Sequence, residues 1–416
     1  MPALDRDFVR SQFPAFAEPT LQGQAFFENA GGSYACTQAI ARLAEYYRRL
    51  KVQPYYPYPA STEAGVWMDA SHVRLAEYLG VAADEVHFGP STSQNSYVLA
   101  RAVRPLLKAG DEVIVTQQDH EANSGVWRRL SELGCVVREW AVERDSGLLD
   151  PARFDALLTG RTRLVALTHC SNVVGHVNPV QALVEKARAA GAITVVDGTA
   201  WAPHGFPDVG ALGADAYLFS LYKTYGPHQG LMVVRRTLIE RLANEGHYFN
   251  AAQPRKRLVP AGPDHAQIAA ARGVAEYFDA FDARHDPGAA AQPSLRAARV
   301  RERLRAAELE LLPRLLQFLG SRPDVRLLGP ADAAVRAPTV SFLPLRASPR
   351  DVAARLAAHG VMAAAGHFYA VRLFEGMGLD SASGAVRLSF VHYTTAEEMD
   401  RLVEALERSL PGAVSA

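Results

Sequence analysis

Between about residues 86 and 235, short runs of β-branched and aromatic residues alternate with longer stretches whose apolar positions recur at helical spacing. The apolar runs are EVHF (85–88), EVIVT (112–116), CVVREW (135–140), RLVALTH (163–169), ITVVD (193–197), AYLFS (216–220) and LMVVR (231–235). The helix candidates between them are residues 93–107, 121–133, 151–159, 179–190 and 208–213. This alternation predicts parallel strands joined by crossover helices, and therefore a doubly wound α/β domain whose strands are buried on both faces.

The pattern changes after about residue 262, where two long helices rich in Ala, Arg and Leu are predicted at 265–283 and 293–319. Short strand candidates at 339–343, 361–365 and 385–391 and a helix over 395–409 follow. This part predicts a smaller α+β domain, with residues 284–293 as the flexible joint before its second helix. We expect three parts: an N-terminal segment 1–25 packed on the small domain, a large domain 26–262 and a small domain 263–416.

Composition excludes several classes of protein. The 416 residues carry 44 Lys+Arg and 44 Asp+Glu, and this zero net charge argues against a nucleic-acid binder or a polybasic membrane-surface protein. The content of 49% hydrophobic and 21% charged residues is that of a globular chain. No membrane span or secretory leader is evident, so we predict a cytoplasmic protein. Cys36, Cys135 and Cys170 show no CxxC spacing, which predicts neither a disulfide framework nor a metal site.

Ligands of open parallel sheets bind at the carboxyl ends of the strands, so the residues that follow each strand are the candidates for chemistry. Ser91, Thr92 and Ser93 open a helix after EVHF, and such a helix N-terminus suits a phosphate. The same residues also fit a simple helix cap. His120 follows EVIVT, where an imidazole can stack on a planar ring, move protons or merely lie in solvent.

Two further strands end in charged residues. Asp197 ends ITVVD, where a carboxylate either holds a protonated ring nitrogen or caps the next turn. Lys223 follows AYLFS in a Gly/Pro-rich loop and is either a desolvated amine nucleophile or a surface lysine. Pyridoxal phosphate (PLP) requires an anion site, an acidic partner for its ring nitrogen and a lysine for a Schiff base. The combination therefore predicts PLP as the cofactor.

The chain resembles the class V aminotransferases of PLP fold type I, specifically the cysteine desulfurase branch. The matching segments are FFENAGGS (26–33), STSQN (91–95), QQDHEANSGVW (117–127), SNVVGHVNPV (171–180), VVDGTAWAPHG (195–205), DVGALGADAYLFSLYKTYGPHQG (208–230), AGHFYA (365–370) and VRLSFVHYTTAEEMDRL (386–402). The resemblance implies the PLP-dependent transferase fold type I, a doubly wound and mainly parallel sheet with a smaller α+β C-terminal domain. It also implies an amino-acid substrate and a homodimer with the active site at the subunit interface.

Site residues carry over one by one from this resemblance. Lys223 matches the Schiff-base lysine, Asp197 the partner of the pyridinium nitrogen and His120 the histidine stacked on the ring. The matches to phosphate ligands are Thr92, Ser93 and Ser220. Asn172 matches an asparagine near the substrate carboxylate and the cofactor O3′, and Arg387 matches the arginine that binds the α-carboxylate. A guanidinium fork suits that planar anion.

The departures from the family concern the reaction rather than the cofactor. Desulfurases carry a nucleophilic cysteine after an RAGHHC-type motif, but residues 364–369 here read AAGHFY and place Tyr369 at that position. Tyrosine forms no persulfide, because that chemistry needs a thiolate. We expect His367 and Tyr369 to approach the substrate. Tyr222 replaces the family's histidine before the lysine and is expected at the phosphate.

Two other positions also differ from the family. Ala200 replaces a glutamine that bonds to O3′, and Pro263 replaces a threonine that the partner subunit contributes to the phosphate. The segment PYYPYPAST (54–62) either lines the mouth of the active site or is a proline-stiffened surface loop.

The leading functional hypothesis is a PLP-dependent enzyme that removes the Cα proton of an amino acid, without persulfide chemistry. Reprotonation at C4′ makes it an aminotransferase, reprotonation at Cα an epimerase, and loss of a β-substituent a carbon–sulfur lyase. A hypothesis of another class is a non-catalytic binding protein with the same fold. A nicotinamide-dependent oxidoreductase is excluded because no GxGxxG motif follows a strand.

Overall fold

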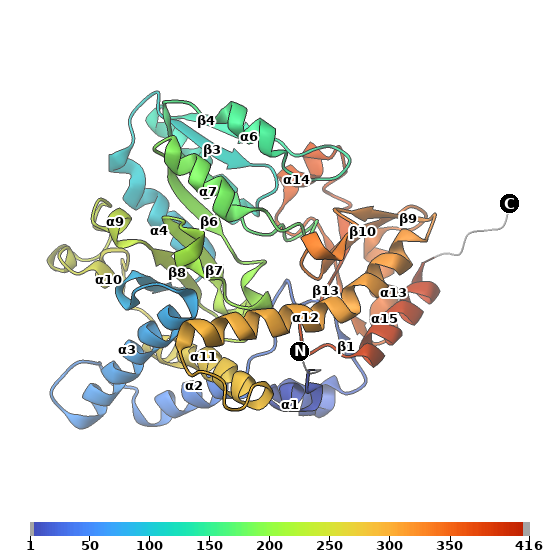
Figure 1. Cartoon of the computed structure of the whole chain (residues 1–416), viewed down its shortest axis with the longest axis horizontal. Coiled ribbons are helices and arrows are strands. Elements are labelled where there is room, and N and C mark those ends of the chain that lie inside the picture. The colour runs from blue at the N-terminus through green and yellow to red at the C-terminus, as the bar shows by residue number, and fades with distance from the viewer. Residues whose placement is uncertain (1–3, 411–416) are drawn as a thin grey trace.

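A computed structural model describes residues 4–410, and a seven-stranded sheet forms its larger part (Figure 1). The strands are β2 (Val86–Gly89), β3 (Glu112–Thr116), β4 (Val136–Trp140), β5 (Thr162–Thr168), β6 (Ile193–Asp197), β7 (Ala216–Ser220) and β8 (Gly230–Val234). Their order is β2-β8-β7-β6-β5-β3-β4, and only β8 runs against its neighbours. The predicted mainly parallel sheet is confirmed.

Helices lie on both faces of this sheet, so its strands contribute to two separate cores. The helices that follow the strands are α4 (Thr92–Val103), α5 (Glu121–Arg128), α6 (Pro151–Leu157), α7 (Val180–Ala189), α8 (Val209–Leu212), α9 (Arg236–Ile239) and α10 (Pro254–Arg257). Alternate residues of the strands face opposite cores, with Ile114 and Val165 on one side and Val113 and Leu164 on the other. Burial on both faces explains why the strands appear in the sequence as continuous apolar runs.

The C-terminal part contains a four-stranded antiparallel sheet in the order β12-β13-β10-β9. Its elements are β9 (Val325–Leu328), β10 (Thr339–Pro344), β12 (Ala364–Gly366), β13 (Ala385–Ser389), α13 (Pro349–Ala358), α14 (Val371–Gly376) and α15 (Ala396–Ser409). The prediction of one strand over 361–365 is wrong. Val361–Met362 (β11) pairs with Ala25–Phe26 (β1), whereas β12 pairs with β13, so the two halves of the run have different partners.

Four long helices pack together, and the last of them extends to the C-terminal part. They are α2 (Thr37–Arg49), α3 (Pro59–Leu79), α11 (His265–His285) and α12 (Pro293–Gly320), and the short α1 (Arg6–Ser11) precedes them. Helix α11 packs on α2 and α3, and α12 passes from α3 and α11 to β9 and α15 (Figure 1). The buried side chains of His204 and Glu308 are 2.7 Å apart. This contact joins α12 to the part of the molecule that contains the seven-stranded sheet. The domain boundaries proposed from the sequence stay predictions.

The N-terminal segment contacts the C-terminal part directly. Arg10 donates from Nη1 to the carbonyl of Tyr393 and to Glu398 Oε2, each at 3.0 Å. Phe13 packs edge-on against Tyr393 with ring centroids 4.9 Å apart. Over residues 4–410, no helix combines the length and the apolar character needed to cross a bilayer.

Candidate active site

The parallel strands bring the predicted site residues together at one edge of the sheet. One cavity there is lined by Ser91, Thr92, Ser93, His120, Asn172, Asp197, Ser220, Tyr222 and Lys223. These residues follow β2, β3, β5, β6 and β7, whose carboxyl ends point the same way. Every residue that the sequence suggested for cofactor binding lies in this one cavity.

The anion-binding end of the cavity is the N-terminus of α4. Ser91 caps this helix, since its hydroxyl accepts from the backbone N–H of Gln94 at 3.1 Å. The hydroxyls of Thr92 and Ser220 are hydrogen-bonded at 2.7 Å. A Cβ at Gly230 would lie 2.3 Å from the carbonyl carbon of Ser91, so glycine lets β8 approach this turn. Free N–H groups and two hydroxyls at a helix N-terminus form a site suited to a phosphate.

His120 enters the cavity as a neutral ring. It precedes α5, and its Nδ1 accepts from the backbone N–H of Ala122 at 3.0 Å, which leaves the ring proton on Nε2. Burial lowers the pKa of His120 to about 4. The adjacent Asp119 is fully buried, hydrogen-bonded to Thr116 and Asn123, and burial raises its pKa to about 8. A neutral, aromatic surface therefore faces the cavity at this point.

Asp197 supplies the carboxylate at the end of β6. Its side chain is buried, at 5% exposure, and Oδ1 accepts from the backbone N–H of Thr199 at 2.8 Å. The hydroxyl of Thr199 is buried in the same cavity and has no hydrogen-bond partner within the described part of the chain. Because buried polar groups are normally paired, this hydroxyl indicates that a polar ligand belongs in the cavity.

Lys223 ends a short turn, Leu221–Lys223, directly after β7. Burial, followed by the positive charge of Arg387, lowers the pKa of Lys223 to about 8. Its Nζ lies 5.7 Å from the ring centroid of Tyr222. The ring of Tyr222 stacks on His228 with centroids 4.5 Å apart and planes at 7°. With this pKa, roughly a tenth of the amine is neutral and nucleophilic at pH 7, a far larger fraction than for a lysine with the ordinary pKa.

Arg387 lies on β13 beside the cavity and is 4% exposed. Its Nη2 is 2.7 Å from Glu28 Oε1, and its Nη1 donates to the carbonyl of Asn172 at 3.2 Å. The guanidinium also covers the ring of Phe368 at 3.9 Å. Asn172 in turn donates from Nδ2 to the carbonyl of Phe368 at 2.9 Å. These contacts bring the predicted carboxylate-binding arginine to the site.

The loop after β12 contains two consecutive residues in left-handed backbone conformation, Phe368 (φ 51°) and Tyr369 (φ 58°). Such conformations cost of order 1–3 kcal/mol each and persist only where surrounding contacts hold them. The carbonyl of Tyr369 accepts from the N–H of Glu121 at 2.8 Å, and its ring lies 5.3 Å from His120. Neither Tyr369 nor His367 lines the cavity itself. Tyr369 adjoins it through His120, and His367 Nδ1 accepts from the backbone N–H of Tyr369 at 3.1 Å.

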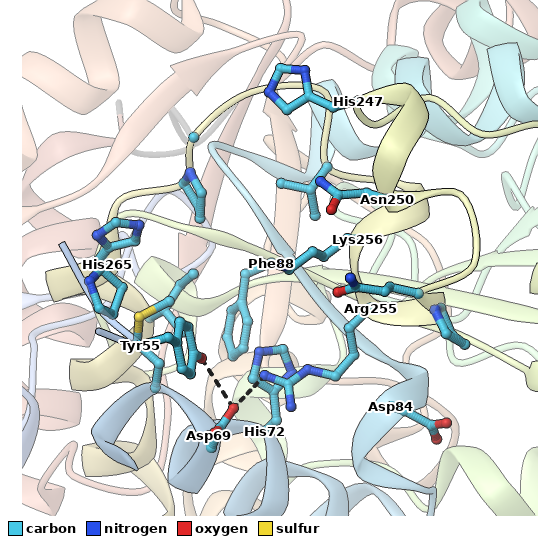
Figure 2. A pocket seen from close by; sticks show the side chains of 18 of the residues that line it. Tyr55, Asp69, His72, Asp84, Phe88, His247, Asn250, Arg255, Lys256 and His265 are labelled. Atoms are coloured by element: carbon cyan, nitrogen blue, oxygen red, sulfur yellow. Dashed lines mark hydrogen bonds and ion pairs between the residues drawn. The ribbon is translucent and has the colours of Figure 1, made fainter. Parts of the chain in front are cut away.

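A second cavity has a volume of about 690 Å³, and Figure 2 shows the side chains that line it; Lys223 is not one of its lining residues. Asp69 is central to its hydrogen bonding, since it accepts from Tyr55 Oη at 3.1 Å and from Arg255 Nη2 at 2.6 Å. Among the described residues, no lining residue is common to this cavity and to that of Lys223. Within the single chain, Tyr55 from the segment 54–62 therefore does not line the Lys223 cavity.

The residues at or beside the Lys223 cavity that the sequence-based predictions lacked include Glu28, Thr168, Thr199 and His228. Glu28 is separated from Arg387 by 359 positions, so no local spacing reveals the pair. Thr199 and His228 fall inside the segments that resemble the family, next to residues that were assigned. Their closeness in sequence to Asp197 and Lys223 was the only signal that could have identified Thr199 and His228 as site residues.

The cysteines do not provide an exposed nucleophile. Cys36, Cys135 and Cys170 are all buried and unpaired. Burial raises the pKa of Cys36 and of Cys170 to about 12. Cys170 lines the Lys223 cavity, but its thiol donates to the carbonyl of Gly175 at 3.3 Å.

Comparison with known proteins identifies the family. Residues 25–282 and 294–402 match the sequence model of the family Aminotransferase class-V. The aminotransferase-like protein FGM3 of Gibberella zeae is 35% identical over 97% of this chain and 98% of its own length. A cysteine desulfurase of Pectobacterium atrosepticum is 32% identical over 96% of this chain and 97% of its own length.

The fold agrees with a solved structure. The apo structure of a cysteine desulfurase from Thermococcus onnurineus NA1 superimposes with a TM-score of 0.85 at 24% identity, and the match covers 99% of both chains.

The cavity fits the cofactor of this family, since it combines a helix N-terminus with hydroxyls, a buried carboxylate, an unpaired buried hydroxyl and a desolvated lysine. The chain belongs to the class V aminotransferase family, in its cysteine desulfurase-like branch, and is a PLP-dependent enzyme of fold type I.

Proposed function

We propose that this enzyme acts on an α-amino acid by removing its Cα proton, with Lys223 as the amine that holds PLP and as the base. The observation that carries the proposal is the convergence of Lys223 and Asp197 on one cavity from the neighbouring strands β6 and β7. The lowered pKa of Lys223, about 8, supports both roles, because only the neutral amine attacks an aldehyde or accepts a proton.

PLP, when bound, supplies an aldehyde that condenses with primary amines and a protonated ring that withdraws electrons from Cα. Thr92, Ser93 and Ser220 hold its phosphate at the N-terminus of α4, with Ser91 and Tyr222 beside them. Asp197 keeps a proton on the ring nitrogen. His120 covers the ring, and because it is neutral it adds no positive charge there. Lys223 moves the proton at Cα.

Arg387 binds the α-carboxylate of the substrate, with Asn172 beside it. A guanidinium offers parallel N–H donors to a carboxylate, and a nearly buried guanidinium binds it more strongly than an exposed one. Tyr369 contacts the substrate from the loop that adjoins His120. His367 supports that loop through the backbone N–H of Tyr369 and contacts the substrate only if the loop moves.

The reaction proceeds without a persulfide. Tyrosine replaces the desulfurase cysteine at position 369, and the three cysteines are buried. A thiol whose pKa is about 12, as for Cys170, is protonated at neutral pH and is a poor nucleophile. These observations favour an aminotransferase or a carbon–sulfur β-lyase over a desulfurase.

The proposal includes a cytoplasmic homodimer. Supporting this assembly, Tyr55 of the cavity in Figure 2 is an exposed aromatic side chain, and the exposed Tyr56 and Phe249 are adjacent in sequence to the lining residues Tyr55 and Asn250. Aromatic side chains are enriched at protein–protein interfaces. Pro263 lines this cavity and also a third cavity, whose lining includes Ser91 and His228. A second subunit that packed against Pro263 would therefore lie next to the phosphate end of the active site.

The test is the visible absorption of the purified holoenzyme during titration with amino acids, including cysteine and S-substituted cysteines. Conversion to the pyridoxamine form, reversed by a keto acid, identifies an aminotransferase. A persistent band with accumulating pyruvate identifies a β-lyase, and accumulation of the opposite enantiomer identifies an epimerase. A protein that binds PLP but responds to no amino acid would contradict the proposal and support a binding protein.

A further inference from the structure

Glu28 places a second carboxylate beside the substrate-binding residues. Its Oε1 lies 2.7 Å from Nη2 of Arg387, and none of the roles assigned above uses it. The side chain of Glu28 is 28% exposed, whereas that of Arg387 is 4% exposed. The carboxylate of Glu28 therefore remains partly in contact with solvent, whereas the guanidinium of Arg387 is almost completely buried.

The backbone fixes Glu28 in this place. Glu28 forms an isolated β-bridge with Ser389, two residues from Arg387 on the same strand. A Cβ at Gly31 would lie 1.9 Å from Glu28 Oε2, so the glycine after Ala30 gives the carboxylate its space. Burial and Arg387 lower the pKa of Lys223, and the negative charge of Glu28 partly opposes this effect, which places Glu28 within electrostatic reach of the reacting centre.

The charges balance only before the substrate arrives. In the structure, the cation of Arg387 is matched by the anion of Glu28. An α-carboxylate bound to Arg387 competes with Glu28 for a single guanidinium, and the partly buried Glu28 carboxylate then loses its cationic partner. An ammonium group on the side chain of the substrate supplies a new partner for Glu28.

We propose that Glu28 is a specificity-determining residue that selects amino acids with a positively charged side chain, the diamino acids. Its carboxylate holds Arg387 until the α-carboxylate of the substrate binds, and then pairs with the side-chain ammonium of the substrate. The inference rests on the proposed function, because it assumes that Arg387 binds the α-carboxylate.

The experiment measures equilibrium binding to the holoenzyme by absorbance and calorimetry. The probes are α-methylornithine and α-methyllysine, paired with α-methylnorvaline and α-methylnorleucine, which lack the ammonium. All four lack a Cα hydrogen and therefore bind without turnover. Wild type is expected to bind each diamino acid roughly tenfold tighter than its uncharged pair, which is the effect of one charge-assisted contact. In Glu28→Gln this preference is expected to disappear, with the uncharged analogues binding more tightly than they do to wild type.

Two outcomes would overturn the inference: a wild type that binds both members of each pair equally, or a preference that survives in Glu28→Gln. The first needs no variant, so the test holds even if the substitution impairs folding. Glu310→Gln is the matched control, because Glu310 pairs with Arg6 on the surface and should leave the preference unchanged. Failure of all four analogues to bind would instead contradict the proposed function.

Discussion

The hydroxyls of Thr92 and Ser220 meet at 2.7 Å although 128 positions separate them in the sequence. Thr92 begins α4 and Ser220 ends β7, so the contact joins the anion-binding turn to the strand that carries Lys223. Both side chains are buried. We therefore expect the sheet to fix the distance between the phosphate site and Lys223.

Thr92→Val and Ser220→Ala are each expected to weaken PLP binding roughly tenfold, since each removes one hydroxyl hydrogen bond to a charged phosphate, worth about 1.5 kcal/mol. The double variant should lose less than the sum, because the two hydroxyls bond to one another. Fluorescence titration of the apoenzyme with PLP measures these affinities. Ser146→Ala, at an exposed turn, is the control. Unchanged affinity in both single variants would place the phosphate elsewhere.

The lowered pKa of Lys223 predicts how fast PLP enters the apoenzyme at different pH values. Only the neutral amine reacts, so the rate should rise as pH increases from 7 to 9, with its midpoint near the pKa of about 8. Arg387→Gln removes a positive charge that lowers this pKa, and its midpoint should shift to higher pH. Stopped-flow absorbance measures both profiles. A midpoint at the ordinary lysine value of 10.5 would contradict the buried placement of Lys223.

Asp119 predicts a pH-dependent stability. Burial raises the pKa of Asp119 from 3.8 to about 8. Between pH 3.8 and about pH 8, the folded state therefore keeps a proton on this carboxyl that the unfolded state has lost. The stability associated with this proton is complete below the unfolded pKa and is lost as pH rises through the folded pKa. In Asp119→Asn this loss should be absent, so the variant should gain stability relative to wild type from pH 5 to pH 8.

Urea unfolding at both pH values measures that difference. Asp380→Asn is the control, because its exposed carboxyl has a lowered pKa and stays ionised across the window. Equal pH dependence in wild type and Asp119→Asn would show that Asp119 is ionised in the folded protein.

Asp197 and Lys223 could be predicted to converge because each follows a buried apolar run, and parallel neighbours end at the same edge of a sheet. The reversed direction of β8 was not predicted, although residues 221–229 are too few for a crossover helix, which needs a dozen or more. The division of the run 361–365 between β11 and β12 depends on partners distant in sequence. The ion pair between Glu28 and Arg387 could not be predicted for the same reason, since the two residues are distant in sequence and meet only in the folded chain.

The attachment site of PLP tests the account most directly. The chain has five lysines, Lys51, Lys108, Lys186, Lys223 and Lys256, and Lys256 lines the separate cavity of Figure 2. Borohydride reduction of the holoenzyme, digestion and mass spectrometry locate the modified residue. We predict the cofactor on Lys223, with labelling lost in Lys223→Ala and retained in Lys256→Ala. Labelling on Lys256, or undiminished labelling in Lys223→Ala, would contradict the assignment of the active site.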